Sequence, residues 1–318
     1  MLDILAITGP IYFSIAVGYL ATRFGLFART DRQVFGKFVI NLAAPALLLK
    51  ALAERPIGEI LNFDYILAYL VGTLAVVGLG LFWCRRIARM NPTTSALCAM
   101  GMACSNSVFI GYPVLLLTLP PVAGVAMALN TTLENIVVTP LMLALAEGGR
   151  AGSGRWYRVI GRSLARLFAN PMLIGLSVGF LISLLGWKLP QPVAQTLGLF
   201  AMTTGALSLF VIGSTLVGLP VGGMVKQVIP IVVGKLVLHP LAVFLSLLAL
   251  PLLGLPPVDP DLRMAAVLMA AVPMLAIYPI LAQMFGQEEF TATALLITTI
   301  ASFFTLSALL GALRFIPV

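Results

Sequence analysis

Residues 104–117 read CSNSVFIGYPVLLL, and residues 272–285 read VPMLAIYPILAQMF. Both stretches place a Tyr-Pro pair inside a long apolar run, and the two pairs, Tyr112-Pro113 and Tyr278-Pro279, stand 166 residues apart. Apolar sequence matches itself readily, so one shared phrase alone is a weak signal of a repeat.

A second match follows the first along the chain. Thr131-Thr132-Leu133 aligns with Thr298-Thr299-Ile300 at an offset of 167 residues. Two phrases in the same order indicate an internal repeat. Dividing the chain near this offset predicts two repeats, residues 1–150 and residues 151–318.

Composition defines the class of protein. Of the 318 residues, 60% are hydrophobic and only 9% are charged, and the mean hydropathy is +1.08. A soluble domain carries about 25% charged residues, so this chain cannot cover a water-exposed surface. The composition excludes a soluble enzyme, a nucleic-acid binder and a disordered chain. It predicts an all-α integral membrane protein, because the apolar runs are helix-length.

Ten apolar runs are long enough to cross a bilayer as helices. Their approximate limits are Ile4–Ala21, Val34–Leu52, Tyr65–Trp83, Thr94–Leu117, Val122–Leu145, Pro171–Trp187, Val193–Val217, Val228–Leu250, Leu262–Phe285 and Phe290–Leu313. The connections between them are short, which predicts no separate soluble domain.

The basic residues predict the orientation in the membrane. Of the 19 lysines and arginines, 13 lie beside or in the loops that follow odd-numbered spans. Cytoplasmic loops are enriched in Lys and Arg, so we expect odd loops inside and both termini outside. The net charge of +8 then reflects loops facing anionic lipid. Five arginines between Arg150 and Arg166 could alternatively form a basic interfacial helix that binds lipid headgroups.

The repeat itself predicts a type of function. Five spans per half is an odd number, so the second repeat is inverted relative to the first. Inverted repeats with broken helices at matching positions point to a secondary transporter with its site near the bilayer midplane. Alternatively, Pro113 and Pro279 only kink two helices of a bundle.

Polar residues accompany the prolines of the fourth and ninth spans. Freed backbone groups are tolerated in a membrane where they line a polar cavity, and helix N-termini favour anions. We therefore expect the two broken spans to form the substrate site. The candidate substrate-binding residues are Asn41, Ser105, Asn106, Ser107, Gly111, Tyr112, Pro113, Pro273, Tyr278 and Pro279.

A carboxylate in the middle of a span indicates a coupling site for a cation. Glu134 shares a helix face with Asn130, and a buried carboxyl inside a membrane is by default a functional residue. The alternative is a structural carboxyl that is hydrogen-bonded to its neighbours. His239 could carry protons, and Lys235, four residues earlier, is expected to extend toward an interface. The candidate coupling residues are Asn130, Thr131, Glu134, Asn135 and His239.

The order of several motifs resembles the auxin efflux carrier family in its bacterial branch, over essentially the whole chain. These motifs are Asn41-x-x-x-Pro45-Ala46-Leu47-Leu48, Ser105-Asn106 ahead of Gly111-Tyr112-Pro113, Asn170-Pro171, Lys235-Leu236-x-x-His239-Pro240, and Val272-Pro273 ahead of Leu281-Ala282 and Gly286.

The resemblance implies the fold of the bile acid sodium symporters, with a scaffold of spans one, two, six and seven and a moving core of the other six. It implies that the fourth and ninth spans cross at the substrate site, through Ser105–Pro113 and Pro273–Pro279. It also implies a homodimer through the scaffold and a bacterial inner-membrane location, with malonate or a related dicarboxylate as substrate.

Two departures from the family pattern bear on substrate and coupling. The loop from Glu147 to Arg166 is short where plant carriers often have a long one, so auxin is not the expected substrate. Residues 267–285 contain no Asp or Glu, so the sodium-binding carboxylate of the symporters has no equivalent there. We expect coupling to a proton in preference to sodium.

The predicted function is secondary active transport of a small organic anion by alternating access. The alternative is a channel or receptor-like membrane protein that binds a small organic acid.

An enzyme is not expected, since one histidine and scattered acids supply neither a nucleophile–base pair nor a metal site. No phosphate-binding loop is present in the sequence, so we expect no cofactor other than a coupling H⁺ or Na⁺. The expected partners are the anion, the bilayer and a second copy of the chain.

Overall fold

The computed structural model describes residues 2–28, 30–56, 62–149, 161, 169–218 and 224–313. Over these residues the protein is built from helices and contains no strand; one isolated bridge pairs Ser105 with Met274. The chain divides into two compact units, each made of three segments. The five arginines from Arg150 to Arg166 lie outside the described residues.

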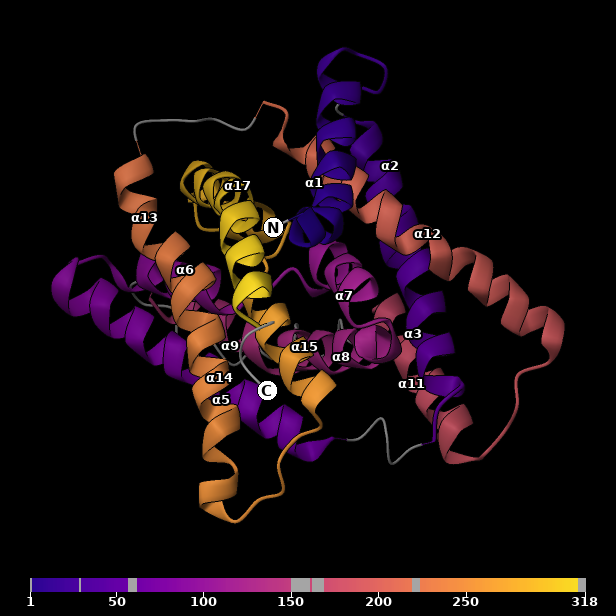
Figure 1. The fold of residues 1–318 in the computed structure, drawn as a ribbon. Coiled ribbons are helices and arrows are strands. Elements are labelled where there is room, and N and C mark those ends of the chain that lie inside the picture. The colour runs from indigo at the N-terminus through magenta and orange to yellow at the C-terminus, as the bar shows by residue number, and fades with distance from the viewer. Residues whose placement is uncertain are drawn as a thin grey trace. The chain divides into compact units, whose positions relative to one another are not determined.

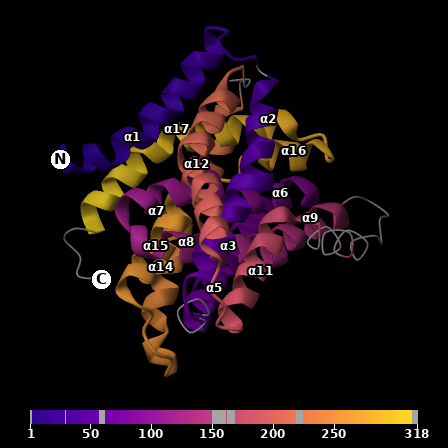
Figure 2. The ribbon, with the colours of Figure 1, turned by 90° about the vertical axis from the view of Figure 1, so that its right-hand side faces the viewer.

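Unit 1 comprises Met1–Phe63, Ser107–Thr131 and Phe168–Gly218. Within it α1 packs on α12, and α3 packs on both α11 and α12 (Figures 1 and 2). Its helical elements are α1 (Leu2–Arg23), α2 (Asp31–Phe38), η1 (Val39–Ala43), α3 (Ala44–Ala53), η3 (Ser107–Gly111), α7 (Tyr112–Thr118), most of α8 (Pro120–Leu133), α11 (Pro171–Leu184) and α12 (Gln191–Leu216).

Unit 2 comprises Asp64–Asn106, Thr132–Leu167 and Leu219–Val318. Within it α6 packs on α9, α14 on α15, and α13 on α17. Its helical elements are α5 (Phe63–Phe82), η2 (Trp83–Ile87), α6 (Pro92–Ala103), η4 (Glu134–Val138), α9 (Thr139–Gly148), α13 (Val225–Val233), η5 (Gly234–Leu238), α14 (His239–Ala249), η6 (Pro251–Leu253), α15 (Pro260–Ala271), α16 (Tyr278–Gln283) and α17 (Glu288–Leu313).

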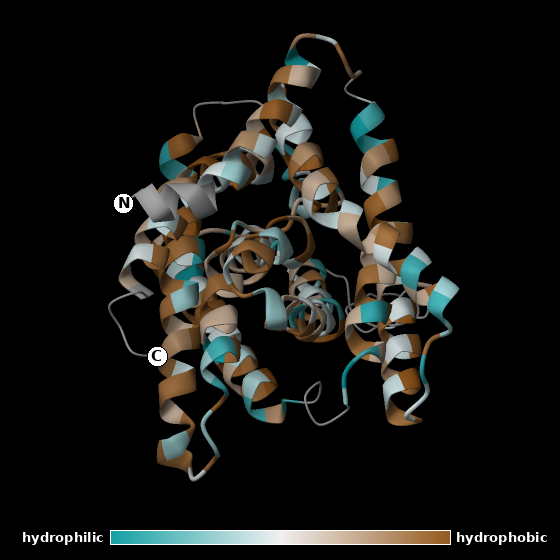
Figure 3. Ribbon diagram, turned by 45° about the vertical axis from the view of Figure 1, so that its right-hand side comes forward, coloured by the Kyte–Doolittle hydropathy of each residue, from teal (hydrophilic) through white to brown (hydrophobic). Residues whose placement is uncertain are grey.

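Among the described residues, six helices are long and apolar enough to cross a membrane. They are Asp31–Ala53, Phe63–Ile87, Pro120–Gly148, Gln191–Leu216, Val225–Ala249 and Glu288–Ala312. Hydrophobic residues prevail along the helices (Figure 3). These helices support the prediction of an integral membrane protein. The ten spans, and the two inverted repeats over residues 1–150 and 151–318, remain predictions. Each compact unit draws on both halves of the sequence.

Four prolines within the described helices follow π-helical turns. The turns η1, η3, η4 and η5 each end two residues before a proline, namely Pro45, Pro113, Pro140 and Pro240. Proline lacks an N–H and clashes with the carbonyl four residues earlier. That carbonyl belongs to the third residue of each π turn, where the wider turn gives it room. The helices therefore continue past these prolines.

The break in the fourth predicted span is shorter than the crossing segment Ser105–Pro113 that the resemblance implied. Only Cys104–Asn106 separates α6 from the helical turn that begins at Ser107. Pro113 is the second residue of α7. In the ninth predicted span the helix ends at Ala271 and resumes at Tyr278, so that break spans residues 272–277 and Pro279 again lies just inside a helix.

Candidate functional site

The two helix breaks meet inside unit 2. The backbone N–H of Asn106 donates to the carbonyl of Pro273 at 2.8 Å, and Ser105 pairs with Met274 as an antiparallel bridge. Ser105, Pro273 and Met274 are all buried. Backbone groups that a broken helix would leave without partners are thus satisfied by the other break, which is the condition for non-helical backbone inside a membrane protein.

A lysine lies at the centre of a buried polar cluster beside these breaks. Lys235, in η5, is 0% exposed. Its Nζ donates to Ser105 Oγ at 2.7 Å and to the carbonyl of Ala270 at 2.6 Å, and it lies 2.9 Å from His239 Nδ1. The expectation that Lys235 extends to an interface is wrong, because these three contacts hold its side-chain nitrogen inside the protein.

Glu134 reaches the same cluster from another element. It is the first residue of η4 and is 4% exposed. Its Oε1 accepts the backbone N–H of Ser105 at 2.8 Å, and its charge interacts with that of Lys235. Ser105 therefore connects the acid and the base, through its N–H on one side and its hydroxyl on the other.

The helix α5 supplies two further polar side chains. Thr73 Oγ1 lies 3.0 Å from His239 Nε2, and the Tyr69 hydroxyl lies 3.3 Å from Ser105 Oγ. The Tyr69 ring meets the His239 ring edge-on with centroids 5.6 Å apart. Both nitrogens of the buried His239 ring therefore have partners. Among the described residues no group of three or more His, Cys, Asp or Glu could hold a metal ion.

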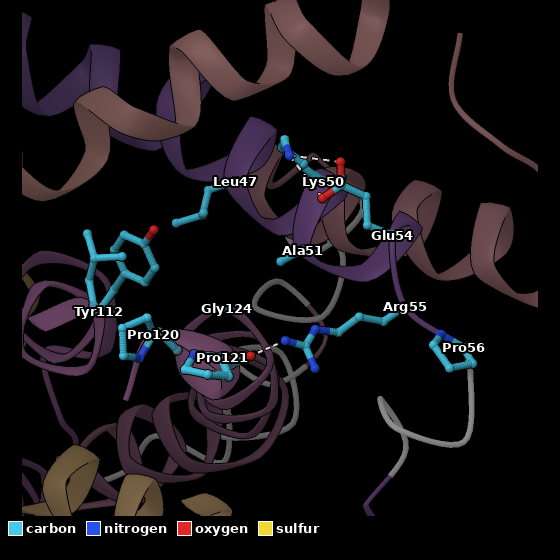
Figure 4. A pocket seen from close by; sticks show the side chains of 12 residues that line it. Leu47, Lys50, Ala51, Glu54, Arg55, Pro56, Tyr112, Pro120, Pro121 and Gly124 are labelled. Carbon is cyan, nitrogen blue, oxygen red and sulfur yellow. Dashed lines mark hydrogen bonds and ion pairs between the residues drawn. The ribbon is translucent and has the colours of Figure 1, made fainter. Parts of the chain in front are cut away.

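Unit 1 contains a pocket of about 600 Å³. Figure 4 shows Lys50 paired with Glu54, and Arg55 donating to the carbonyl of Pro121. The apolar part of the wall includes Leu47 and the ring of Tyr112. The described residues that line the pocket are Leu47, Lys50, Ala51, Glu54, Arg55, Pro56, Tyr112, Leu116, Pro120, Pro121, Ala123 and Gly124. Two of these side chains are basic and one is acidic, so the described lining carries a net positive charge.

The predicted site residues fall into both units. Unit 1 holds Asn41, Ser107, Gly111, Tyr112, Pro113, Asn130 and Thr131, and unit 2 holds Ser105, Asn106, Glu134, Asn135, His239, Pro273, Tyr278 and Pro279. The structure brings Ser105, Glu134 and His239 into one cluster around Lys235, with Asn106 and Pro273 at the adjoining breaks. Asn41 instead donates to the carbonyl of Lys37 in its own helix, at 2.7 Å.

The sequence analysis did not identify Tyr69, Thr73 and Lys235 of the buried cluster in unit 2 as site residues, nor Lys50 and Arg55 of the pocket in unit 1. Tyr69 and Thr73 stand four apart in an otherwise apolar span, which was the available signal for a polar helix face. Lys235 in an otherwise uncharged span was the stronger signal, because such a charge marks a functional site by default. Lys50 and Arg55 gave none, since basic residues near the end of a span are ordinary.

The fold and this site together define the class of protein. Over the residues that the structure describes, the chain is helical and has six membrane-length helices, and a lysine and a glutamate are buried beside its helix breaks. These features define a multi-pass membrane protein with an internal polar site. Residues 6–310 match the model of a family described as membrane transport protein. The chain belongs to this family, the auxin efflux carrier family, which confirms the predicted resemblance.

Two relatives extend this result. The chain is 30% identical over 321 aligned residues to a "Putative malonate transporter" of Rhizobium meliloti (strain 1021), covering 99% of this chain and 97% of the relative. It is 27% identical over 206 residues to an "Uncharacterized transporter" of Methanothermobacter thermautotrophicus, covering 64% of each chain. The family and these relatives are membrane transporters and not enzymes.

Proposed function

We propose that the protein is a secondary active transporter that carries a small organic anion, a dicarboxylate such as malonate, by alternating access coupled to a cation. The observation that carries the anion assignment is the positively charged pocket of unit 1. The name given to the Rhizobium relative supports the same substrate class, and the division of the chain into two compact units supports a carrier with two moving parts.

The pocket has the size and chemistry for a small carboxylate. Ligand pockets commonly enclose roughly 300–1,000 Å³, and the volume here is about 600 Å³. Arg55 can bind a carboxylate through two parallel hydrogen bonds. Lys50 is already paired with the carboxylate of Glu54, with Nζ–O distances of 2.8 and 2.9 Å. A substrate carboxylate would replace Glu54 as the partner of Lys50.

A binding panel of mono- and dicarboxylates on the purified protein tests this assignment by thermal shift. We expect malonate or a close dicarboxylate to stabilise the protein, and Arg55→Gln to weaken its apparent affinity by about tenfold, the effect of losing one charge-assisted hydrogen bond. Lys188→Gln removes an exposed charge of unit 1 outside the pocket and is the matched control. Stabilisation by no anion, or equal effects of the two variants, would refute the assignment.

Coupling to a cation follows from the charge of the substrate. Moving a dianion into a cell against an inside-negative potential costs roughly 2.3 kcal/mol of free energy per charge per 100 mV. Glu134 is the carboxyl placed to carry a compensating proton, because it is buried in unit 2 and interacts electrostatically with Lys235. The proposal favours a proton over sodium.

Glu134→Gln tests the coupling. The amide oxygen of Gln can still accept the Ser105 N–H, so we expect the variant to fold and to exchange substrate across the membrane. It should fail to accumulate substrate in proteoliposomes under an imposed pH gradient. Glu289→Gln, at an exposed position of unit 2, should accumulate normally. Accumulation by Glu134→Gln, or wild-type uptake that ignores both pH and sodium gradients, would contradict this role.

Location and assembly complete the proposal. We place the protein in the bacterial inner membrane with both termini outside, as the distribution of basic residues favours. We also assign it a homodimer through the scaffold helices, on the resemblance alone.

A further inference from the structure

Lys235 has a complete set of partners. An ammonium group has three N–H donors and no acceptor. Its Nζ donates to Ser105 Oγ and to the Ala270 carbonyl, and it lies 2.9 Å from His239 Nδ1. The charged form of Lys235 satisfies all three contacts when His239 Nδ1 is the third acceptor.

The partners of His239 determine where the remaining proton lies. In that form Nδ1 accepts from Lys235, so the ring carries its proton on Nε2, which lies 3.0 Å from Thr73 Oγ1. His239 is then neutral. The buried carboxyl of Glu134, which is linked to Lys235 through Ser105, favours this charged form of the lysine.

The oxygen atoms around Lys235 are of the kinds that bind a monovalent metal ion. One is a hydroxyl oxygen, and one is the carbonyl of Ala270 in the last turn of α15, where the helix is interrupted. The C-terminal end of a helix carries partial negative charge, and such ends at broken helices coordinate Na⁺ in transporters. A carboxylate, Glu134, adds the balancing charge.

We infer that the Lys235 ammonium is a built-in cation that takes the place of a coupling metal ion between the two helix breaks. The inference deepens the proposed cation coupling and rests on it. It implies that the carrier does not use Na⁺, and that removal of the lysine side chain creates a site for Na⁺, Li⁺ or a small primary ammonium ion. The titratable groups that face this position are Tyr69, Cys104, Glu134 and His239.

The first test uses the wild-type protein. Its melting temperature and its malonate uptake should be equal in sodium, potassium and choline salts at the same ionic strength. A melting temperature or an uptake rate that rises specifically with Na⁺ would overturn the inference. This test does not depend on the folding of any variant.

The second test uses Lys235→Ala. In choline salt we expect uptake to fall by roughly tenfold or more, because a buried carboxylate loses its counter-charge. Methylammonium or Na⁺ should restore part of the uptake and raise the melting temperature, whereas tetramethylammonium, which has no N–H and is larger, should do neither. A folded variant that responds to no cation would overturn the inference.

Two controls separate charge from packing. Lys235→Met fills a similar volume without charge or metal ligands, so it should lose uptake and gain no response to Na⁺. Lys226→Ala removes an exposed lysine of α13 in the same unit and should behave as wild type. If the wild-type protein carries no carboxylate, the proposed function fails, but the melting temperatures of wild type and Lys235→Ala still decide whether Lys235 occupies a cation site.

Discussion

The two Tyr-Pro pairs are alike in sequence and differ in their surroundings. The Tyr278 hydroxyl donates to the carbonyl of Leu97 at 2.7 Å inside unit 2, whereas Tyr112 lines the pocket of unit 1 and its hydroxyl bonds to none of the described residues. We expect Tyr278→Phe to lower the free energy of unfolding by about 1 kcal/mol, the net value of one buried hydrogen bond, and Tyr112→Phe to change it by less than about 0.5 kcal/mol. Thermal unfolding in detergent measures both. Equal losses would mean that Tyr112 also has a structural partner.

At the scale of elements, glycines allow α1 and α12 to approach closely within unit 1. A Cβ added at Gly213 would overlap the backbone carbonyl of Ile15, and one at Gly18 would overlap that of Phe210. Small residues at such crossings let membrane helices pack backbone to backbone. We expect Gly213→Ala to destabilise the protein by roughly 1–3 kcal/mol, the usual cost of overpacking. A clear loss of melting temperature in detergent would show it.

The matched control for Gly213→Ala is another glycine inside a helix. Gly78 lies within α5 with nothing within 4 Å of an added Cβ, so Gly78→Ala should be neutral or stabilising by about 0.5–1 kcal/mol, because Gly is a poor helix residue. If Gly213→Ala is tolerated as well as Gly78→Ala, the close crossing of α1 and α12 does not contribute to stability.

At the scale of the whole molecule, the predicted topology can be tested by cysteine labelling. The three native cysteines, Cys84, Cys98 and Cys104, are buried and can be replaced to give a cysteine-free background. A cysteine at Arg155 should be protected from an impermeant thiol reagent added to intact cells, and one at Leu252, which is 87% exposed, should react. Leu252 lies in the loop that follows the eighth predicted span, which the predicted orientation places outside. The Asp259 side chain of the same loop caps α15, so a cysteine there would disturb that helix. The opposite labelling pattern would reverse the orientation.

The sequence by itself determined the class of the protein, because hydrophobicity acts residue by residue and needs no tertiary contact. A charged fraction of 9% already requires a bilayer, and the ordered motifs around Pro113, His239 and Pro279 indicated the family that the comparisons confirm. Glu134 and His239 were also found from sequence, since an ionisable side chain inside a span is conspicuous whatever its partners.

Only the tertiary structure decided which of these residues meet. Ser105 and Lys235 are 130 positions apart in the sequence, yet Ser105 Oγ lies 2.7 Å from Lys235 Nζ. Helical periodicity relates residues of one helix and cannot predict contacts between different helices. The same limit made Lys235 look like an interfacial lysine and concealed Tyr69 and Thr73. Three-dimensional geometry also decided where each helix breaks. A π-helical turn accommodates Pro113, so the helix continues there. The breaks occur at Asn106 and Pro273, where the N–H of Asn106 donates to the carbonyl of Pro273.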